Sequence, residues 1–390
     1  MKKLSHINAV TAIMFCFFTM GIADMDSIAT NYIKADMSLT DTMANIFPSM
    51  VLLCFLFFSI PTGILINKVG RKKTVLISLI ITLLGLIPPI FGTNFFIMFT
   101  SFCLLGIGNV LMQVSVNLLV TNVIQGDNVS STITLGQFIK TVASFSGPLI
   151  TAWGAIYFLG GLGWKIIYPI FIVIDIITLL YLWSVQIKET TEDYTKNISI
   201  SNFVKLLKDG FLLLCFFCIF SNVGIDVGLS VTAPKLLQEK LNIGLDEAGF
   251  STSFYYLLRI VGCLSGTFIL KRISNLSFFI ISTLLIVMGM IGLFIFDTQL
   301  LLYISIGLIG YGNSNTFPIV YSEAIAQKKD KQNEISSLMI MALFGGAVFL
   351  LFMGIVSDAM GTQIGALIVM SAAVVYYIIY SYIFSKKVTH

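Results

Sequence analysis

Long apolar stretches follow one another from the first residues of the chain to the last, and short polar segments separate them. A helix crosses the ~30 Å hydrocarbon core of a membrane with about 20 apolar residues. The pattern predicts twelve membrane-spanning helices, near residues 7–30, 43–67, 74–93, 95–124, 131–160, 164–186, 209–235, 247–270, 276–296, 299–325, 332–357 and 361–386. We therefore expect an all-α polytopic membrane protein.

The longest polar stretch, KETTEDYTKNISISNFVKLLKD at 188–209, divides the predicted helices six and six. We expect a six-helix bundle over residues 1–187, a cytoplasmic linker over 188–208 and a second six-helix bundle over 209–390. Similar residues recur 202 to 204 positions apart, as GIGN at 106–109 and GYGN at 310–313, Gly63 and Gly266, and Asp24 and Asp226. This common spacing suggests a duplicated six-helix unit, the plan of transporters that bind substrate between repeats near the midplane.

Composition and charge agree with a membrane protein and indicate its orientation. Of the residues, 57% are hydrophobic and 11% are charged. Seventeen Lys and Arg residues fall on the side of the two termini and four on the other, so the positive-inside rule places both termini in the cytoplasm. The basic residues form no long tract, which gives nucleic-acid binding no support.

The sequence offers no pattern for an enzyme, a metal or a cofactor. Cys215 and Cys218 form a CxxC inside an apolar segment, where packing by small residues is the favoured interpretation. His6 and His390 lie outside the predicted spans. We expect neither a metal site nor a cofactor.

Acidic residues inside predicted spans are functional candidates because a charge at the bilayer centre is costly. We expect Asp24 and Asp226, at similar places in the two halves, to couple transport to a cation. The alternative is that both acids are solvated and structural. A structural role is favoured for Asp26 and for Asp175, which stands alone in FIVIDIITLL.

Two basic residues and several amides are expected to contact the substrate. Lys140 shares a polar stripe with Gln137, and Arg259 lies well inside the eighth span, where it binds substrate or forms a structural pair with Asp226. Amides offer both donors and acceptors, which suits several hydroxyl groups on one ligand. Pro318 predicts a kink in the tenth span. The expected substrate-binding residues are Asn109, Gln113, Asn117, Gln137, Lys140, Arg259, Asn313 and Asn315; for the amides, hydrogen bonding between helices is the alternative.

The segment GILINKVGRK at 63–72 resembles the loop motif of the major facilitator superfamily, Gly-x-Leu-x-Asp-x-x-Gly-Arg-Lys. The resemblance implies a cytoplasmic gate in which Gly63 and Gly70 allow close helix approach and Arg71 forms pairs. Asn67 stands where the family usually has an acid, which weakens the implied charge network.

Within that superfamily the chain resembles the fucose/glucose–galactose permease-like sugar:proton symporters. The resemblance rests on GIGNVLMQVSVNLLV and SSTITLGQFIKTVASFSGPL in the first half, and on GYGNSNTFPIVYS and EISSLMIMALFGGAVFLLFMGIVSDAMG in the second. It implies the twelve-helix fold and sugar symport. Gln113 occupies the apparent position of a coupling glutamate, which puts proton coupling there in doubt, and Lys140 stands where a neutral amide is usual.

These observations predict a secondary transporter for a sugar or similar small polar solute, driven by protons or sodium, working as a monomer in the lipid bilayer of a bacterial inner membrane. Lys140 and Arg259 leave an acidic sugar, such as a uronate or a sialic-acid-like compound, as an alternative substrate. A drug exporter and a non-transporting solute sensor are two rival functions for the same architecture.

Overall fold

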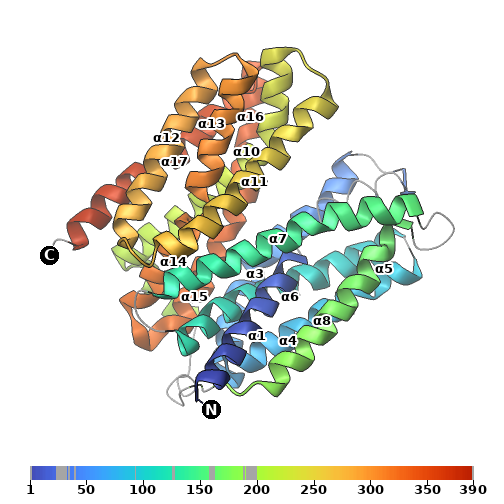
Figure 1. Ribbon diagram of the computed structural model, residues 1–390, viewed down its shortest axis with the longest axis vertical. Helices are drawn as coiled ribbons and strands as arrows, with labels where there is room; N and C mark the ends of the chain where they lie inside the picture. The colour runs from blue at the N-terminus through green and yellow to red at the C-terminus, as the bar shows by residue number, and fades with distance from the viewer. Residues whose placement is uncertain are drawn as a thin grey trace. The chain divides into compact units, whose positions relative to one another are not determined.

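The computed structural model describes residues 2–22, 33, 36–38, 41–92, 94–124, 128–157, 163–187, 189 and 200–388. These residues form helices that fall into two compact units (Figure 1). Unit 1 comprises Met1–Val129, Gly136–Lys205 and Lys328–Met341, and unit 2 comprises Ser130–Leu135, Leu206–Gln327 and Ala342–His390. Each unit thus includes a short segment from the other half of the sequence. The division at residues 188–208 stays a prediction.

Unit 1 contains the helices of the first half together with two short helices from the second. They are α1 (Lys2–Ile22), α3 (Asp41–Val69), α4 (Arg71–Leu86), α5 (Pro88–Phe91), α6 (Phe95–Val123), most of α7 (Asn128–Tyr157), η2 (Gly163–Ile166), α8 (Ile167–Ser184), most of α9 (Ile200–Leu207), η4 (Lys329–Lys331) and α15 (Gln332–Met341).

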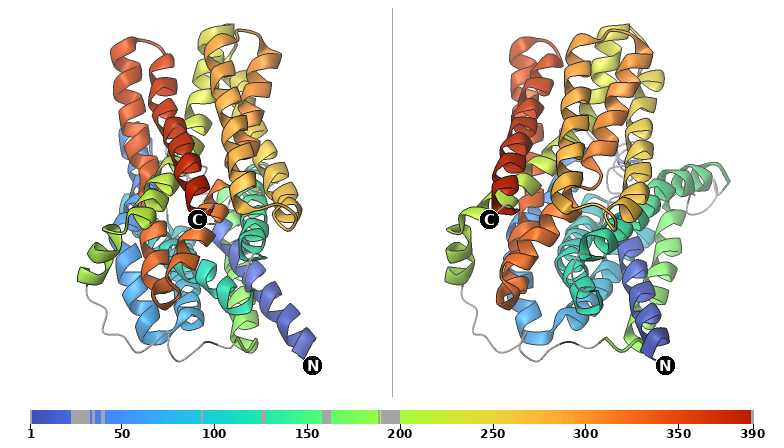
Figure 2. Two further views of the ribbon diagram at one scale, coloured as in Figure 1. Left: turned by 90° about the vertical axis from the view of Figure 1, so that its left-hand side faces the viewer. Right: turned by 60° about the vertical axis from the view of Figure 1, so that its left-hand side comes forward.

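Unit 2 contains the remaining helices. They are α10 (Gly210–Leu241), α11 (Leu245–Ile269), α12 (Asn275–Ile295), α13 (Gln299–Asn313), α14 (Thr316–Gln327), η5 (Ala342–Phe344), α16 (Gly345–Met360) and α17 (Ile364–Val388). Within this unit, α16 packs beside α17 and α12 packs beside α13 (Figure 2).

The helices of the described residues lie where the apolar pattern predicts spans. Nine are long and apolar enough to cross a membrane, and Ile7–Gly21 forms a shorter apolar helix. The kink predicted at Pro318 is confirmed as a break: α13 ends at Asn313 and α14 begins at Thr316. Pro318 lies in the first turn of α14, where a missing N–H costs little. A second break, at η5 between α15 and α16, was not predicted.

Equivalent close contacts in the two units support the duplication inferred from the sequence. Glycines with no Cβ let neighbouring helices approach closely inside a membrane. Three such contacts in unit 1 recur in unit 2 with both partners 204 residues further on: Gly85 on Leu105 and Gly289 on Ile309, Gly106 on Val51 and Gly310 on Tyr255, and Gly108 on Ser78 and Gly312 on Ser282. The two units therefore share a packing scheme as well as similar sequences.

Candidate functional site

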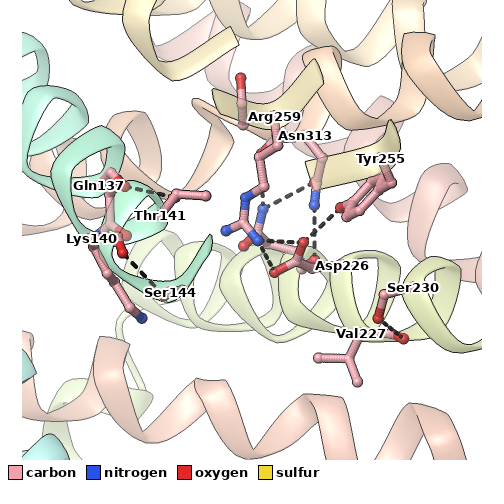
Figure 3. A network of polar contacts seen from close by, with 12 residues as sticks. Gln137, Lys140, Thr141, Ser144, Asp226, Val227, Ser230, Tyr255, Arg259 and Asn313 are labelled. Carbon is pink, nitrogen blue, oxygen red and sulfur yellow. Dashed lines mark hydrogen bonds and ion pairs between the residues drawn. The ribbon is translucent and has the colours of Figure 1, made fainter. Parts of the chain in front are cut away.

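An ion pair between two membrane-spanning helices is the most prominent polar feature of unit 2 (Figure 3). NH1 of Arg259, on α11, donates to both carboxylate oxygens of Asp226, on α10. One turn before Arg259, the hydroxyl of Tyr255 donates to Oδ1 of Asp226 over 2.6 Å. The Arg259 and Asp226 side chains are 21% and 15% exposed. Arg259 therefore forms the ion pair with Asp226 that the sequence offered as one of its two interpretations.

The ion pair uses only part of the hydrogen-bonding capacity of its arginine. The guanidinium carries five N–H donors, and Nε of Arg259 is buried without a hydrogen-bond partner among the described residues. The carboxylate is better satisfied because it accepts from both Arg259 and Tyr255. The pair is close to neutral overall, so Arg259 contributes little net positive charge to its surroundings.

A second polar cluster in unit 2 ties α10 to the break between α13 and α14. Nδ2 of Asn222 donates to Oδ1 of Asn313 over 3.0 Å and to Oγ1 of Thr316. The hydroxyl of Tyr377, on α17, donates to Oδ1 of Asn313 over 3.1 Å. Asn313 is 1% exposed. Its contacts are hydrogen bonds between helices, and its role at a substrate site stays a prediction.

Asn315 lies in the same break and contacts α11. Its Nδ2 donates to the carbonyl of Gly262 over 2.9 Å, and its side chain fills the space over Gly266. Asn315 is fully buried, and its Oδ1 has no partner among the described residues. The geometry explains why α11 carries glycine at these two positions, because a Cβ at either one would collide with α13 or the break.

In unit 1 the three amides of α6 form a continuous ladder along one face of the helix. Nε2 of Gln113 donates to Oδ1 of Asn109 over 3.3 Å, and Nδ2 of Asn117 donates to the carbonyl of Gln113 over 2.8 Å. All three are buried, and Oδ1 of Asn117 has no hydrogen-bond partner among the described residues. The three amides thus share one face of α6, and their contact with substrate stays a prediction.

The polar stripe of α7 is also present (Figure 3). Thr141 donates to the carbonyl of Gln137 over 2.7 Å, and Ser144 donates to the carbonyl of Lys140 over 3.0 Å. Ser144 also donates to the carbonyl of Gly21 over 3.1 Å, so this part of α7 lies directly against the end of α1. Lys140 is half-buried, and Gln137 is buried.

Asp24 and Asp26 follow α1 and lie outside the described residues. The coupling role expected of Asp24 stays a prediction. Asp226, its counterpart in the sequence, is held by Arg259 and Tyr255 as described above.

The motif at 63–72 forms the junction of α3 and α4. Gly70 has a φ of 99°, which only glycine adopts without strain. Its N–H donates to the carbonyl of Ile66 over 2.7 Å and closes α3. Gly63 contacts Ser337 of α15, and a Cβ at Gly63 would collide with that side chain.

Arg71 is 3% exposed and gathers several oxygen acceptors of unit 1 around its guanidinium. Nε donates to Oδ1 of Asn333 over 3.0 Å, NH2 donates to Oε1 of Gln332 over 3.0 Å, and NH1 donates to Oγ1 of Thr121 over 3.1 Å. Asn67 takes part in the same network, because it accepts from Nδ2 of Asn333. Asn67, which stands where the motif usually has an acid, thus forms a hydrogen bond with the amide of Asn333.

Sequence reasoning missed several members of these networks. Asn222 precedes Asp226 by four residues and so lies on the same face of α10. This spacing is visible in the sequence and could have identified Asn222 as a candidate. Nothing in the sequence connects Asn333 with Asn67 or Arg71, because 262 residues separate Asn333 from Arg71. The link requires α15 to fold into unit 1, which only the structure reveals.

The apolar helices and the polar groups buried inside them define a polytopic α-helical membrane protein. The family model described as "Major Facilitator Superfamily" matches residues 10–329, and the chain belongs to this family of transporters rather than to a family of enzymes.

Among curated proteins, the chain is 21% identical over 374 residues to the glucose/galactose transporter of Brucella abortus strain 2308, covering 92% of this chain and 90% of that one. Among solved structures it is similar to FucP, an MFS transporter in the outward conformation, with a TM-score of 0.83 and 17% identity, covering 97% of this chain and 99% of that one. The proton:xylose symporter XylE gives a TM-score of 0.76 and 13% identity, covering 99% and 96%. These similarities confirm the twelve-helix major facilitator fold expected from the sequence.

Proposed function

We propose that this protein carries a sugar or a sugar-like small polar solute across the cytoplasmic membrane of a bacterium by alternating access. Transport is coupled to protons or sodium, both chain termini face the cytoplasm, and the monomer is the working unit. The six-helix bundles over residues 1–187 and 209–390 rock about a central site. The sugar specificity of the Brucella transporter, similar over 92% of this chain, agrees with this substrate class.

The amide ladder of α6 is the observation that carries the proposal. A buried amide oxygen without a hydrogen bond costs free energy, and Oδ1 of Asn117 is such an atom among the described residues. Hydroxyl groups of a sugar are donors that would satisfy it, while Asn109 and Gln113 offer further donors and acceptors along the same face. A drug exporter would be expected to have a less amide-rich cavity.

The charges favour a neutral sugar over an acidic one. Asp226 neutralises Arg259, so this arginine has little net attraction left for a carboxylate. Lys140 keeps an acidic sugar as the second candidate, because an ammonium group on the polar stripe of α7 would attract a carboxylate. Asp24 and Asp226 are the candidate residues for coupling transport to the cation.

Uptake into proteoliposomes tests the proposal. The panel contains labelled neutral hexoses, deoxyhexoses, hexuronates and sialic acid, each with and without a proton or sodium gradient. We expect gradient-driven accumulation of a neutral sugar. Accumulation of dyes in the export direction, with no uptake of any sugar, would overturn the assignment, and binding without movement would indicate a sensor.

Two substitutions on α6 connect uptake to the amide ladder. Gln113→Ala removes the middle of the ladder, and we expect it to raise the KM for the sugar at least tenfold, which corresponds to about 1.4 kcal/mol. Ser115→Ala is the matched control. Ser115 is buried on the same helix about 200° away from Gln113, and among the described residues its hydroxyl bonds only the carbonyl of Leu111, within the helix. Equal effects of the two substitutions would exclude a specific role for the ladder.

Lys140→Gln separates the two substrate classes. With an acidic sugar as substrate, loss of this charge should abolish uptake. With a neutral sugar, uptake should weaken without being lost, since glutamine retains a donor. Unchanged affinity for the transported compound would remove Lys140 from the substrate site.

A further inference from the structure

A carboxyl group in the interior of unit 1 has no function assigned so far. Asp175, in the middle of α8, is 0% exposed. Neither of its two carboxyl oxygens has a hydrogen-bond partner among the residues that the structure describes. An isolated carboxylate in such surroundings is strongly disfavoured relative to the neutral acid. Burial without a partner therefore favours the protonated form of Asp175 in this conformation.

Among the described residues, the charged and titratable groups on the elements that pack against α8 offer the carboxylate no compensation. Helices α1, α4 and α5 and the turn η2 pack against α8. On α1 the thiol of Cys16 lies near Asp175, and the basic residues of α1 precede Cys16 by ten residues or more. On η2 the titratable residue is Lys165, and α5 has none.

The basic residues of α4 are confined to its first turn, at the far end of α8. Lys72 marks that end, because its ammonium group donates to the carbonyl of Val185 over 2.7 Å. Val185 follows Asp175 by ten residues, which is about 15 Å along a helix. Arg71, in the same turn, is bound to the acceptors of Asn333 and Gln332.

The counterpart of Asp175 in unit 2 indicates what the carboxyl group could reach. The buried positions of α8 recur on α17 after 202 residues: Tyr168, Phe171, Asp175, Thr178 and Leu182 correspond to Met370, Ala373, Tyr377, Tyr380 and Phe384. Asp175 thus occupies the place of Tyr377, whose hydroxyl donates to Asn313 over 3.1 Å. The counterpart of Asn313, 204 residues earlier, is Asn109 at the start of the amide ladder. A carboxyl group is shorter than a tyrosine side chain, and at this position it makes no such bond.

We propose that Asp175 is a proton-binding residue of the transport cycle, neutral in the conformation described here and ionised in another. The carboxylate takes one proton from one side of the membrane to form the carboxylic acid, and the acid releases that proton to the other side. Release requires a conformation in which water or an amide donor, such as that of Asn109, reaches the carboxyl oxygens. This inference rests on the proposed function, since it assigns the coupling ion of the same transporter.

Infrared spectroscopy tests the protonation of Asp175 without any substrate. In reconstituted protein near neutral pH, the wild type minus Asp175→Asn difference spectrum should contain the carbonyl stretching band of a protonated carboxyl group. The band should shift on exchange into D₂O, as an O–H group requires. If the difference spectrum contains no such band, Asp175 is ionised and the proposal is wrong, whichever solute the protein carries.

Transport measurements test the coupling itself. Asp175→Asn keeps the shape and the neutral state, so sugar exchange at equal pH should continue, while proton-driven accumulation should fall to the external concentration. Asp175→Glu should restore part of the accumulation with a shifted pH profile. Thr178→Val is the matched control: it lies one turn further along the same face of α8 and loses a buried hydrogen bond to Thr19, but no titratable group.

The outcomes distinguish the coupling inference from the function. Normal proton-driven accumulation by Asp175→Asn would overturn the inference and leave sugar transport intact. An equal loss of exchange in Asp175→Asn and Thr178→Val would assign Asp175 a packing role. If no sugar is taken up by the wild type, the proposed function fails, and the infrared band still decides the state of Asp175.

Discussion

Removing one partner of the Asp226–Arg259 pair should destabilise the protein more than removing both. Asp226→Asn leaves the guanidinium in a mostly buried position without its carboxylate and takes the charged acceptor from Tyr255. Breaking a buried pair in this way costs ~3–5 kcal/mol. Because the two side chains are 21% and 15% exposed, water offsets part of the loss, and we expect about 3 kcal/mol.

The double variant Asp226→Asn with Arg259→Met should recover most of this stability. It places an apolar side chain of similar length where the guanidinium lies, and an uncharged amide remains as an acceptor for Tyr255. Replacing both members of a buried pair is often close to neutral. We therefore expect a coupling energy of at least ~2 kcal/mol between the two substitutions in a double-mutant cycle.

Thermal unfolding in detergent with a thiol-reactive dye measures this order. The chain contains six free cysteines, of which Cys103 is partly exposed and the others are buried, so the dye reports on loss of the folded core. The expected order of midpoints is wild type, then the double variant, then Asp226→Asn. Additive losses in the two single variants would refute the argument that the pair is a unit. Normal cation-driven accumulation by the stable double variant would also exclude Asp226 from coupling.

Two further predictions concern helix packing in each unit. Asn333→Ala leaves Nε of Arg71 and Oδ1 of Asn67 without this partner, so the amides of α15 should exchange hydrogen faster by a factor equivalent to ~1–3 kcal/mol. Ser337→Ala is the control, because it loses a hydrogen bond within α15 and the packing of its hydroxyl on Gly63, but no hydrogen bond to Arg71 or Asn67; equal exchange in both variants would exclude a specific role of the Asn333 side chain in holding α15. Gly289→Ala should lower the unfolding midpoint through ~1–3 kcal/mol of overpacking, since its Cβ would lie 2.6 Å from the carbonyl oxygen of Ser305. Gly354→Ala, with nothing within 4 Å, should not lower it, and similar losses for both would contradict the packing model.

The apolar pattern predicted the helices well because the membrane imposes a length on each span, whatever its neighbours. The repeat was also visible, and GIGN and GYGN pointed to the equivalent glycines that now pack against α3 and α11. The break at η5 could not be predicted in the same way. The turn at residues 342–344 is followed directly by Gly345 and Gly346, which disfavour a continuous helix, but the apolar pattern runs through the break and so predicted a single span.

The polar residues were easier to find than to pair. A charge inside an apolar segment is conspicuous, which is how Asp226 and Arg259 became candidates. Their roles depended on whether two helices bring them within reach, and the sequence left a functional and a structural interpretation open. The structure brings them together, while the position that looked least functional, Asp175, is the one whose carboxyl oxygens have no partner among the described residues.

The comparison of α8 with α17 explains why that position matters. Immediately after a duplication, two equivalent positions have the same residue and the same neighbours. Each position can afterwards acquire a different side chain. On α17 the position became Tyr377, which satisfies its hydroxyl group and stabilises the core of unit 2. On α8 it is an acid whose oxygens no described residue satisfies, although an apolar residue would be more stable there. A contribution to stability does not explain why a buried acid stands at position 175. Binding a proton in one conformation and releasing it in another does explain it.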